Sequence, residues 1–238
     1  MPRFLAEVIP RSSWPPAASS FAAEVDSLFL AITVVVGVWW VASELALVAW
    51  TWAALRRRHS AVVTASDRRR EGRWILRLAA LVLVCDLAIE ARGHGLWARI
   101  VAPPPRTALP IRIEARQFAW LVHHPGRDRT LGTADDIELQ NELHIPVGEP
   151  VEVRLTSRDV IHSFFLPAMR VKQDVLPGTE ARRWFVATQA GSFPLACAEL
   201  CGFGHYRMAG ELVVHDPASY EELAGERTPI GVHREGES

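Results

Sequence analysis

Residues 103–121 read PPPRTALPIRIEARQFAWL, and the spacing of the apolar residues changes within this stretch. The three consecutive prolines cannot continue a helix, so residues 103–110 are predicted to form a stiff linker. From Ile111 to Leu121, apart from Gln117, small or apolar residues occupy every second position, which is the period of a strand with one buried face. The prolines therefore separate two parts of the chain that differ in structure.

The part that follows the linker is typical of a β domain. Residues 151–156 alternate in the same way, and shorter strand candidates occur at 184–188 and 211–214, separated by turns rich in Pro and Gly. Between residues 111 and 214 the sequence shows no helical period of useful length. We predict an all-β sandwich or barrel over residues 111–215, followed by a polar tail at 216–238.

The part that precedes the linker contains a long apolar run, residues 27–55, in which Glu44 is the only ionisable side chain. A helix of about 20 such residues crosses the hydrocarbon core of a bilayer. The run is too long for the apolar region of a cleavable signal peptide, and it is apolar on all sides, unlike most core helices. Trp50 and Trp52 suit a membrane interface. We therefore predict a transmembrane helix here.

A second apolar run, residues 74–101, is less clear because charged side chains interrupt it, and each costs a few kcal/mol in hydrocarbon: Arg77, Asp86 and Glu90. Cys85, in the same run, is expected to be a buried free thiol. The loop at 56–73 is predicted to be cytoplasmic by its arginines: Arg56, Arg57, Arg58, Arg68, Arg69, Arg70 and Arg73. If both runs cross, residues 27–102 form a helical hairpin, and residues 1–26 lie outside with the β domain.

The net charge of −1 results from two oppositely charged halves. Residues 1–107 carry five more basic than acidic side chains, and residues 108–238 carry six more acidic than basic ones. A near-neutral chain argues against a nucleic-acid-binding protein, which needs an excess of Lys and Arg to neutralise phosphates. Three cysteines are too few for a disulfide-stapled scaffold. The acidic half either attracts a basic partner or only keeps the domain soluble.

The residues with the most chemical information lie in CAELCGFGHYRM, residues 197–208. Two thiols, an imidazole and a thioether occur there, from Cys197, Cys201, His205 and Met208, and His162 follows the strand predicted at 151–156. Sulfur ligands select soft metals, and a methionine beside cysteine and histidine favours copper. A disulfide between the two cysteines, a zinc site, and a packing role for Met208 are the alternatives.

Taken together, these residues resemble subunit 2 of the cytochrome c oxidases, the haem–copper respiratory oxidases. The resemblance lies in C-x-E-x-C-x₃-H-x₂-M at 197–208, in V-x-H-S-F around His162, in AAEVDSL at 22–28 and in MRVKQDVLPG at 169–178. It implies a membrane-anchored all-β protein in which an N-terminal transmembrane helical hairpin precedes a cupredoxin-like domain over residues 111–215.

The resemblance also implies a binuclear copper A centre with two copper ions. The cysteines would bridge the ions, each histidine would bind one of them, and a thioether and a backbone carbonyl would be weak ligands. These ligands are Cys197, Cys201, His162, His205, Met208 and the carbonyl of Glu199. The side chain of Glu199 would reach a magnesium or manganese ion shared with subunit 1, since hard cations prefer carboxylates.

By the same resemblance, the centre accepts electrons from cytochrome c and passes them to haem in subunit 1, where oxygen is reduced and protons are pumped. The partners would be subunit 1, other oxidase subunits and the lipid membrane, with no nucleic acid. The protein would lie in a bacterial inner membrane, with the β domain in the periplasm. The alternative is a membrane-tethered cupredoxin outside the oxidase, either a copper carrier or an electron-entry domain like that of nitrous oxide reductase.

The sequence departs from the family pattern at the strand that enters the β domain. Relatives carry Q-W-x-W there, whereas this chain has Phe118 and Trp120, which we expect to share one face and to form the electron entry. Glu71 falls where relatives carry a carboxylate at the mouth of a proton channel, and a salt bridge within the Arg-rich loop is the alternative. Residues 125–136 form a Gly- and Asp-rich segment that suits a hairpin loop better than a calcium site.

Overall fold

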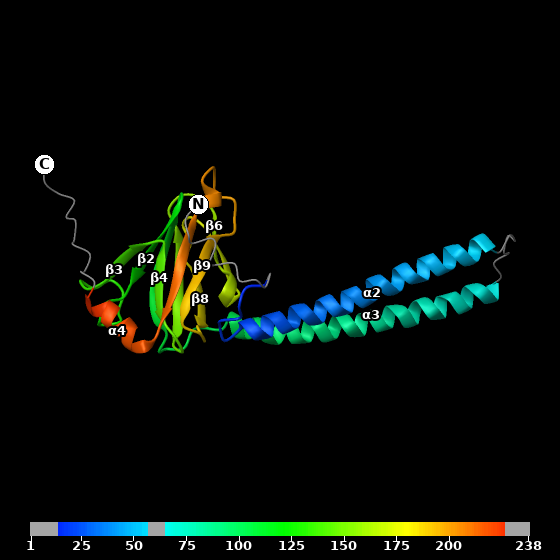
Figure 1. The fold of residues 1–238 in the computed structure, drawn as a ribbon. Coiled ribbons are helices and arrows are strands. Elements are labelled where there is room, and N and C mark those ends of the chain that lie inside the picture. Colours follow the sequence, from blue (N-terminus) through cyan, green and yellow to red (C-terminus); the bar gives the residue numbers. More distant parts are fainter. Residues whose placement is uncertain (1–13, 57–64, 227–238) are drawn as a thin grey trace. The chain divides into compact units, whose positions relative to one another are not determined.

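The computed structural model describes residues 14–56 and 65–226 (Figure 1). The chain forms two compact units. One combines the segment before the first helix with the residues from Ile100 onward, and the other is Glu24–Arg99. Arg57 and Arg58 of the predicted cytoplasmic loop, and most of the predicted polar tail, lie outside the described residues.

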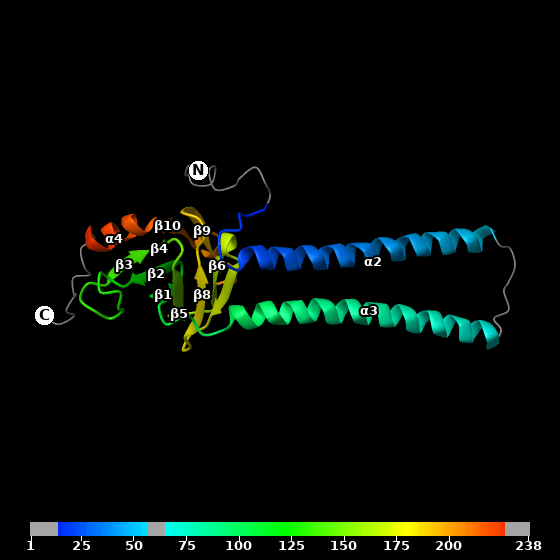
Figure 2. The same cartoon turned by 90° about the horizontal axis from the view of Figure 1, so that it is seen from below.

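The helical unit consists of α2 (Ala22–Arg56) and α3 (Ala65–Ile100), which run antiparallel to each other (Figures 1 and 2). Near one end of the unit Arg99 forms an ion pair with Glu24. Because α3 begins at Ala65, the second half of the predicted loop is helical. Arginine is a good helix former, so an Arg-rich segment next to an apolar helix readily extends that helix.

In the part of the chain that the structure describes, α2 alone is long and apolar enough to cross a membrane by length and composition. Its large apolar side chains are exposed, including Leu30 and Trp50, as expected for a helix that faces lipid. This supports the predicted membrane anchor. α3 does not meet the same measure because its charged residues interrupt the apolar surface, so the structure offers one candidate span where the sequence suggested two.

The second unit is the predicted β-sandwich, with two five-stranded sheets (Figure 1). The first sheet has, in spatial order, β3 (Ile137–Gln140), β2 (Ala119–His124), β1 (Leu109–Arg116), β5 (Pro150–Ser157) and β8 (Ala181–Val186). The second has β4 (Glu142–Pro146), β10 (Ala209–His215), β9 (Gly191–Cys197), β6 (His162–Leu166) and β7 (Val171–Val175). Alternate apolar residues of both sheets fill the space between them, as Ile111 and Leu155 of the first sheet and Phe164 of the second show by their complete burial.

The strand predicted over residues 111–121 is in fact a hairpin. β1 ends at Arg116, and after a turn at Gln117 and Phe118 the chain returns as β2, with Arg116 paired to Ala119. The turn changes which positions face the core: odd-numbered residues are buried in β1, whereas Trp120 and every second residue after it are buried in β2. A count of every second position, carried through the turn, therefore assigns the residues of β2 to the wrong face of the sheet.

The residues just before α2 pack against the β-sandwich. Oγ of Ser19 donates to the carbonyl oxygen of Met169 at 2.7 Å, and the ring of Phe21 meets the ring of Trp184 edge-on with centroids 5.1 Å apart. The predicted separate N-terminal segment is thus, at residues 17–22, part of the β unit. Its apolar residues are buried in the core of the β-sandwich, and the sequence pattern alone does not reveal this contact.

The predicted polar tail begins with a helix, α4 (Pro217–Glu226), which places Tyr220 in the core with 4% of its surface exposed. The loop at 125–136 joins β2 to β3, and its carboxylates accept hydrogen bonds from the loop itself. For example, the backbone N–H of Gly132 donates to Asp136 at 2.7 Å. These internal hydrogen bonds agree with a hairpin loop.

Candidate metal centre

The predicted ligands come from three neighbouring strands of the second sheet and the loop between two of them. His162 begins β6, Cys197 ends β9, and Met208 directly precedes β10. Because Phe164 pairs with Cys197 across β6 and β9, and β10 pairs with β9, these strand ends lie at the same edge of the sheet. Cys201 and His205 lie on the loop that connects β9 to β10.

The sulfur and nitrogen atoms of these side chains lie within a few ångströms of one another. Sγ of Cys197 is 3.8 Å from Sγ of Cys201 and 3.9 Å from Nδ1 of His162. Sγ of Cys201 is 3.5 Å from Nδ1 of His205 and 3.7 Å from Sδ of Met208. Both cysteines are free thiols, because a disulfide would hold the sulfurs about 2 Å apart.

The backbone of Glu199 also reaches this cluster, since its carbonyl oxygen is 3.2 Å from Sγ of Cys197. The Glu199 side chain is exposed. The structure therefore places the peptide group of this residue toward the sulfurs and leaves the carboxylate accessible. The six predicted ligand positions are all brought to one end of the sandwich.

Most of the cluster is shielded from water. His162 is completely buried, Met208 is 2% exposed and Cys201 is 4% exposed. Burial, together with the neighbouring Cys197, raises the pKa of the Cys201 thiol to about 11. In the absence of a metal this thiol holds its proton at neutral pH, and a metal ion that binds it must displace that proton.

A hydrogen-bonded network surrounds the cluster, and the sequence alone did not reveal this network. Oδ1 of Asp159 lies 2.8 Å from Nε2 of His162, and Oδ2 accepts the backbone N–H of Gln117 at 2.7 Å. The Gln117 side chain donates to the carbonyl oxygen of Cys201 at 2.6 Å. Partial burial would raise the pKa of Asp159, but its hydrogen bonds with His162 and the backbone lower it below the ordinary value. The spacing of three residues between Asp159 and His162 was the only signal in the sequence.

The two aromatic residues predicted as the electron entry occupy different environments. Phe118 lies in the β1–β2 turn, half-buried, with its ring against Gly204 of the ligand loop. Trp120 is completely buried and its ring lies edge-on to His162, with centroids 6.2 Å apart. They do not share a face, because the turn separates them. Glu71 is exposed on α3, in the helical unit.

The donor set fits a soft transition metal. His162, Cys197 and Cys201 offer ligand atoms that all lie within 4.8 Å of one another, which is close enough to hold a metal ion. Thiolates and a thioether disfavour hard cations, and imidazole suits copper and zinc. The thioether, absent from most zinc sites, tips this chemistry toward copper.

Comparison with known proteins agrees with this geometry. The family described as cytochrome c oxidase subunit II, periplasmic domain, matches residues 117–215, a range that contains every candidate ligand. Most of the β domain of this chain is thus similar to the cytochrome c oxidase subunit II family. The match begins after β1, so the β domain of this chain extends beyond the matched range at its N-terminal side.

Individual relatives are similar over part of their length. The alternative cytochrome c oxidase subunit 2 of Bradyrhizobium diazoefficiens is 34% identical over 56% of each chain, and the subunit 2 of Thermostichus vulcanus is 42% identical over 48% of this chain and 32% of its own. A crystal structure shows the periplasmic domain of subunit II of cytochrome oxidase from Bradyrhizobium japonicum, which is 28% identical to this chain. The match covers 52% of this chain and 95% of that chain, with a TM-score of 0.46. The chain thus spans about half or less of the curated relatives it matches.

Proposed function

We propose that this chain is the electron-transfer subunit of a cytochrome c oxidase and that it holds a binuclear copper A centre. The observation that carries the proposal is the convergence of six ligand-type groups at one edge of the second sheet, with the two cysteine sulfurs 3.8 Å apart. A disulfide or a packing role for the thioether would not require both histidines to face those sulfurs.

The positions of the residues support the following roles. Cys197 and Cys201 would bridge two copper ions, His162 and His205 would each bind one ion through Nδ1, and Met208 and the Glu199 carbonyl would be weak ligands. When bound, such a centre accepts and releases one electron. The protein fixes the ligands on paired strands, which keeps their movement between redox states small.

The exposed Glu199 carboxylate is available to a magnesium or manganese ion shared with subunit 1, since its own backbone faces the sulfurs. We also assign the entry of electrons to the surface near Phe118, because Trp120 is buried and cannot contact a donor. Glu71 would lie at the mouth of a proton channel, and its exposure on α3 leaves its carboxylate accessible for that role.

The donor would be cytochrome c, and the acceptor would be haem in subunit 1, where oxygen is reduced and protons are pumped. An excess of six acidic side chains in residues 108–238 supports a basic donor, because opposite charges accelerate association. Other oxidase subunits would complete the complex.

The proposed topology has two spans, with the β domain on the periplasmic side of a bacterial inner membrane. Its support comes from the ends of the helices. The segment just before α2 packs on the β-sandwich through Ser19 and Phe21, and α3 ends where the linker to the same sandwich begins. If α2 crosses the membrane, α3 must cross it back, whatever its charges cost. Subunit 1 would then have to accommodate Asp86 and Glu90.

Electron paramagnetic resonance of the purified full-length chain, loaded with copper, tests the copper assignment. A seven-line hyperfine pattern is expected, because one unpaired electron is shared between two copper nuclei. The signal should disappear in Cys197→Ser and in Cys201→Ser and persist in Cys85→Ser, the third cysteine. A spectrum of one isolated copper ion, or a signal that survives either loop substitution, would overturn the assignment.

Affinity purification of the chain from its native membrane tests the oxidase assignment separately. Haem that co-purifies with the wild-type chain supports an oxidase complex. A copper-loaded chain that carries the seven-line signal but no haem would instead identify a membrane-tethered cupredoxin.

A further inference from the structure

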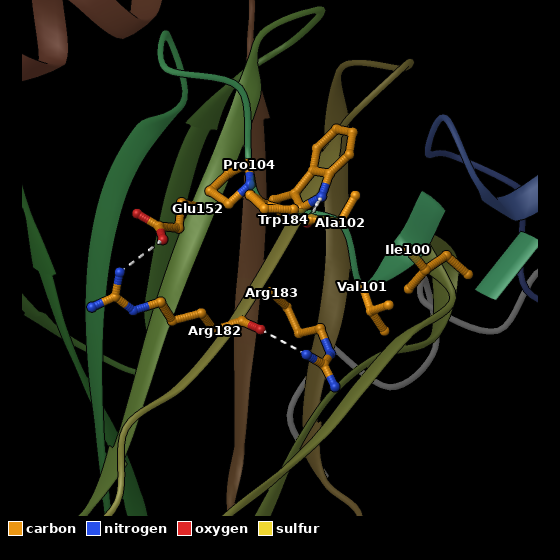
Figure 3. A pocket seen from close by; sticks show the side chains of 9 residues that line it. Ile100, Val101, Ala102, Pro104, Glu152, Arg182, Arg183 and Trp184 are labelled. Carbon is orange, nitrogen blue, oxygen red and sulfur yellow. Dashed lines mark hydrogen bonds and ion pairs between the residues drawn. The ribbon is translucent and has the colours of Figure 1, made fainter. Parts of the chain in front are cut away.

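A cavity of about 300 Å³ lies at the edge of the first sheet (Figure 3). None of the candidate metal ligands lines it. One wall is Ile100–Pro104, which runs from the last residue of α3 into the linker, and the other is β8 with Glu152 of β5. The Nε1 group of Trp184 donates to the carbonyl oxygen of Ala102 at 2.9 Å, which fastens the linker to β8. The proposed function uses none of these residues.

One cation of the cavity has no carboxylate partner among the described residues. Glu152 is 6% exposed and is satisfied by Arg154 at 2.9 Å, with Arg182 at 3.7 Å. Arg182 is further paired with Glu180 at 2.7 Å. Arg183 donates to the carbonyl oxygen of Arg182 at 2.8 Å, and no carboxylate of the described residues lies within ion-pair distance of its guanidinium. The guanidinium of Arg183 is therefore available to an anionic ligand.

The other lining residues are apolar. Ile100, Val101, Pro103 and Pro104 form the linker wall, so the ligand also has an apolar part. Arg182 and Arg183 extend to opposite sides of β8, as consecutive strand residues do, and Arg183 extends to the side of Val101 (Figure 3). A planar guanidinium beside apolar side chains suits a phosphate that is attached to a hydrophobic group.

The position of the cavity along the chain identifies the source of such a ligand. Ile100 is the last residue of α3, so the cavity begins where the proposed second span leaves the hydrocarbon. Phosphate groups of lipids are concentrated at that level of a bilayer, and Trp side chains are enriched there. We propose that this cavity binds the phosphate and glycerol groups of an anionic phospholipid, with Arg183 as the phosphate ligand.

The test is lipid retention by the full-length chain. The chain is assembled into nanodiscs with equal amounts of phosphatidylglycerol and phosphatidylcholine, extracted gently and analysed by native mass spectrometry. The wild type is expected to retain one phosphatidylglycerol in preference to phosphatidylcholine. Arg183→Gln should lower that retention about tenfold, because it removes a charge-assisted hydrogen bond. Arg183→Lys should keep most of it, since it preserves the charge.

The matched control is Arg112→Gln, an exposed arginine of the same sheet that does not line the cavity. It should retain lipid like the wild type, and circular dichroism of all variants should be unchanged. Equal retention in Arg183→Gln and wild type would overturn the proposal. So would inorganic phosphate that binds the wild type as tightly as the lipid does, because the apolar wall would then contribute nothing.

Discussion

Asp159 fixes the orientation of His162: its Oδ1 lies 2.8 Å from Nε2 of the ring, and Nδ1 is left to face Sγ of Cys197. Carboxylates that hold a ligating histidine in this way typically contribute 10- to 100-fold to metal affinity. Asp159→Ala should therefore weaken copper binding by about 10- to 100-fold in a chelator competition.

The control for this prediction is Glu138→Ala. Glu138 also pairs with an imidazole, that of His123 at 3.5 Å, but His123 is not a candidate ligand. Copper affinity should be unchanged by this substitution. If both alanine variants weakened copper binding equally, the change in affinity would come from the loss of a negative charge in general. The orienting role of Asp159 would then be rejected.

Gly204 is required because Phe118 fills the space where a side chain would go. A Cβ atom at this position would lie 2.4 Å from the Phe118 ring, which is far inside van der Waals contact. Gly204→Ala should move the ligand loop, cost about 1–3 kcal/mol and reduce the copper signal. Addition of Phe118→Ala to this variant should restore part of the loss, as measured in a double-mutant cycle.

Gly95→Ala is the control for the loop variant, since a Cβ atom there meets nothing within 4 Å. It should leave the copper signal unchanged. A double variant no better than Gly204→Ala alone would show that the glycine is needed for some reason other than Phe118.

Phe21 anchors the segment before α2 to the β unit, where it is 8% exposed and contacts Trp184. Phe21→Ala should lower the free energy of unfolding of the β unit by about 3 kcal/mol, because it leaves a cavity in a packed core. Urea unfolding in detergent, followed by fluorescence, measures the loss. Phe29→Ala, at a position 54% exposed on α2, should have little effect, and an equal loss in both would contradict the anchoring role.

Tyr220 should make the unfolding free energy fall at alkaline pH. Burial raises the pKa of its hydroxyl to about 12, above the ordinary value of about 10. Between these values the unfolded chain loses the proton and the folded chain keeps it. The contribution of Tyr220 to stability is therefore complete below about pH 10 and falls by about 1.4 kcal/mol per pH unit above it, until the folded-state pKa is reached.

Urea unfolding from pH 8 to pH 11 measures this slope. The buried Cys201 thiol, whose pKa is raised to about 11, lowers the stability over part of the same range, so the tyrosine variants are compared in a Cys201→Ser background. In that background Tyr220→Phe should remove the slope, whereas Tyr206→Phe, at the other tyrosine of the chain, should not, because Tyr206 is 79% exposed. A slope that persists in Tyr220→Phe would assign the effect to another group.

Much of the fold was predictable from local pattern. The apolar run at 27–55 contains one ionisable residue, so α2 could be recognised without any tertiary information, and α2 meets the length and composition of a membrane span. The alternation after the linker correctly indicated a β-sandwich. The turn at Gln117 and Phe118 was missed because it lies between two strands whose apolar patterns run together, so position counting continued through it.

For the candidate site, the sequence supplied the ligand types but not their surroundings. Cys197, Cys201, His205 and Met208 stand out because thiol, imidazole and thioether groups are rare and close together. Asp159 carries no such mark, since an aspartate in a loop usually faces water. Its role becomes visible when β6 places His162 within hydrogen-bond distance of it.

The sequence by itself determined the two kinds of structure and the chemistry of the ligand set, because both depend on residue types at short spacing along the chain. Tertiary structure alone decided which distant groups meet. It placed the ring of Phe118 against Gly204, buried Trp120 beside His162, and packed Phe21 against the β-sandwich. Those contacts depend on strand pairing and on the packing of sheets, which bring together residues many positions apart, and no local pattern encodes them.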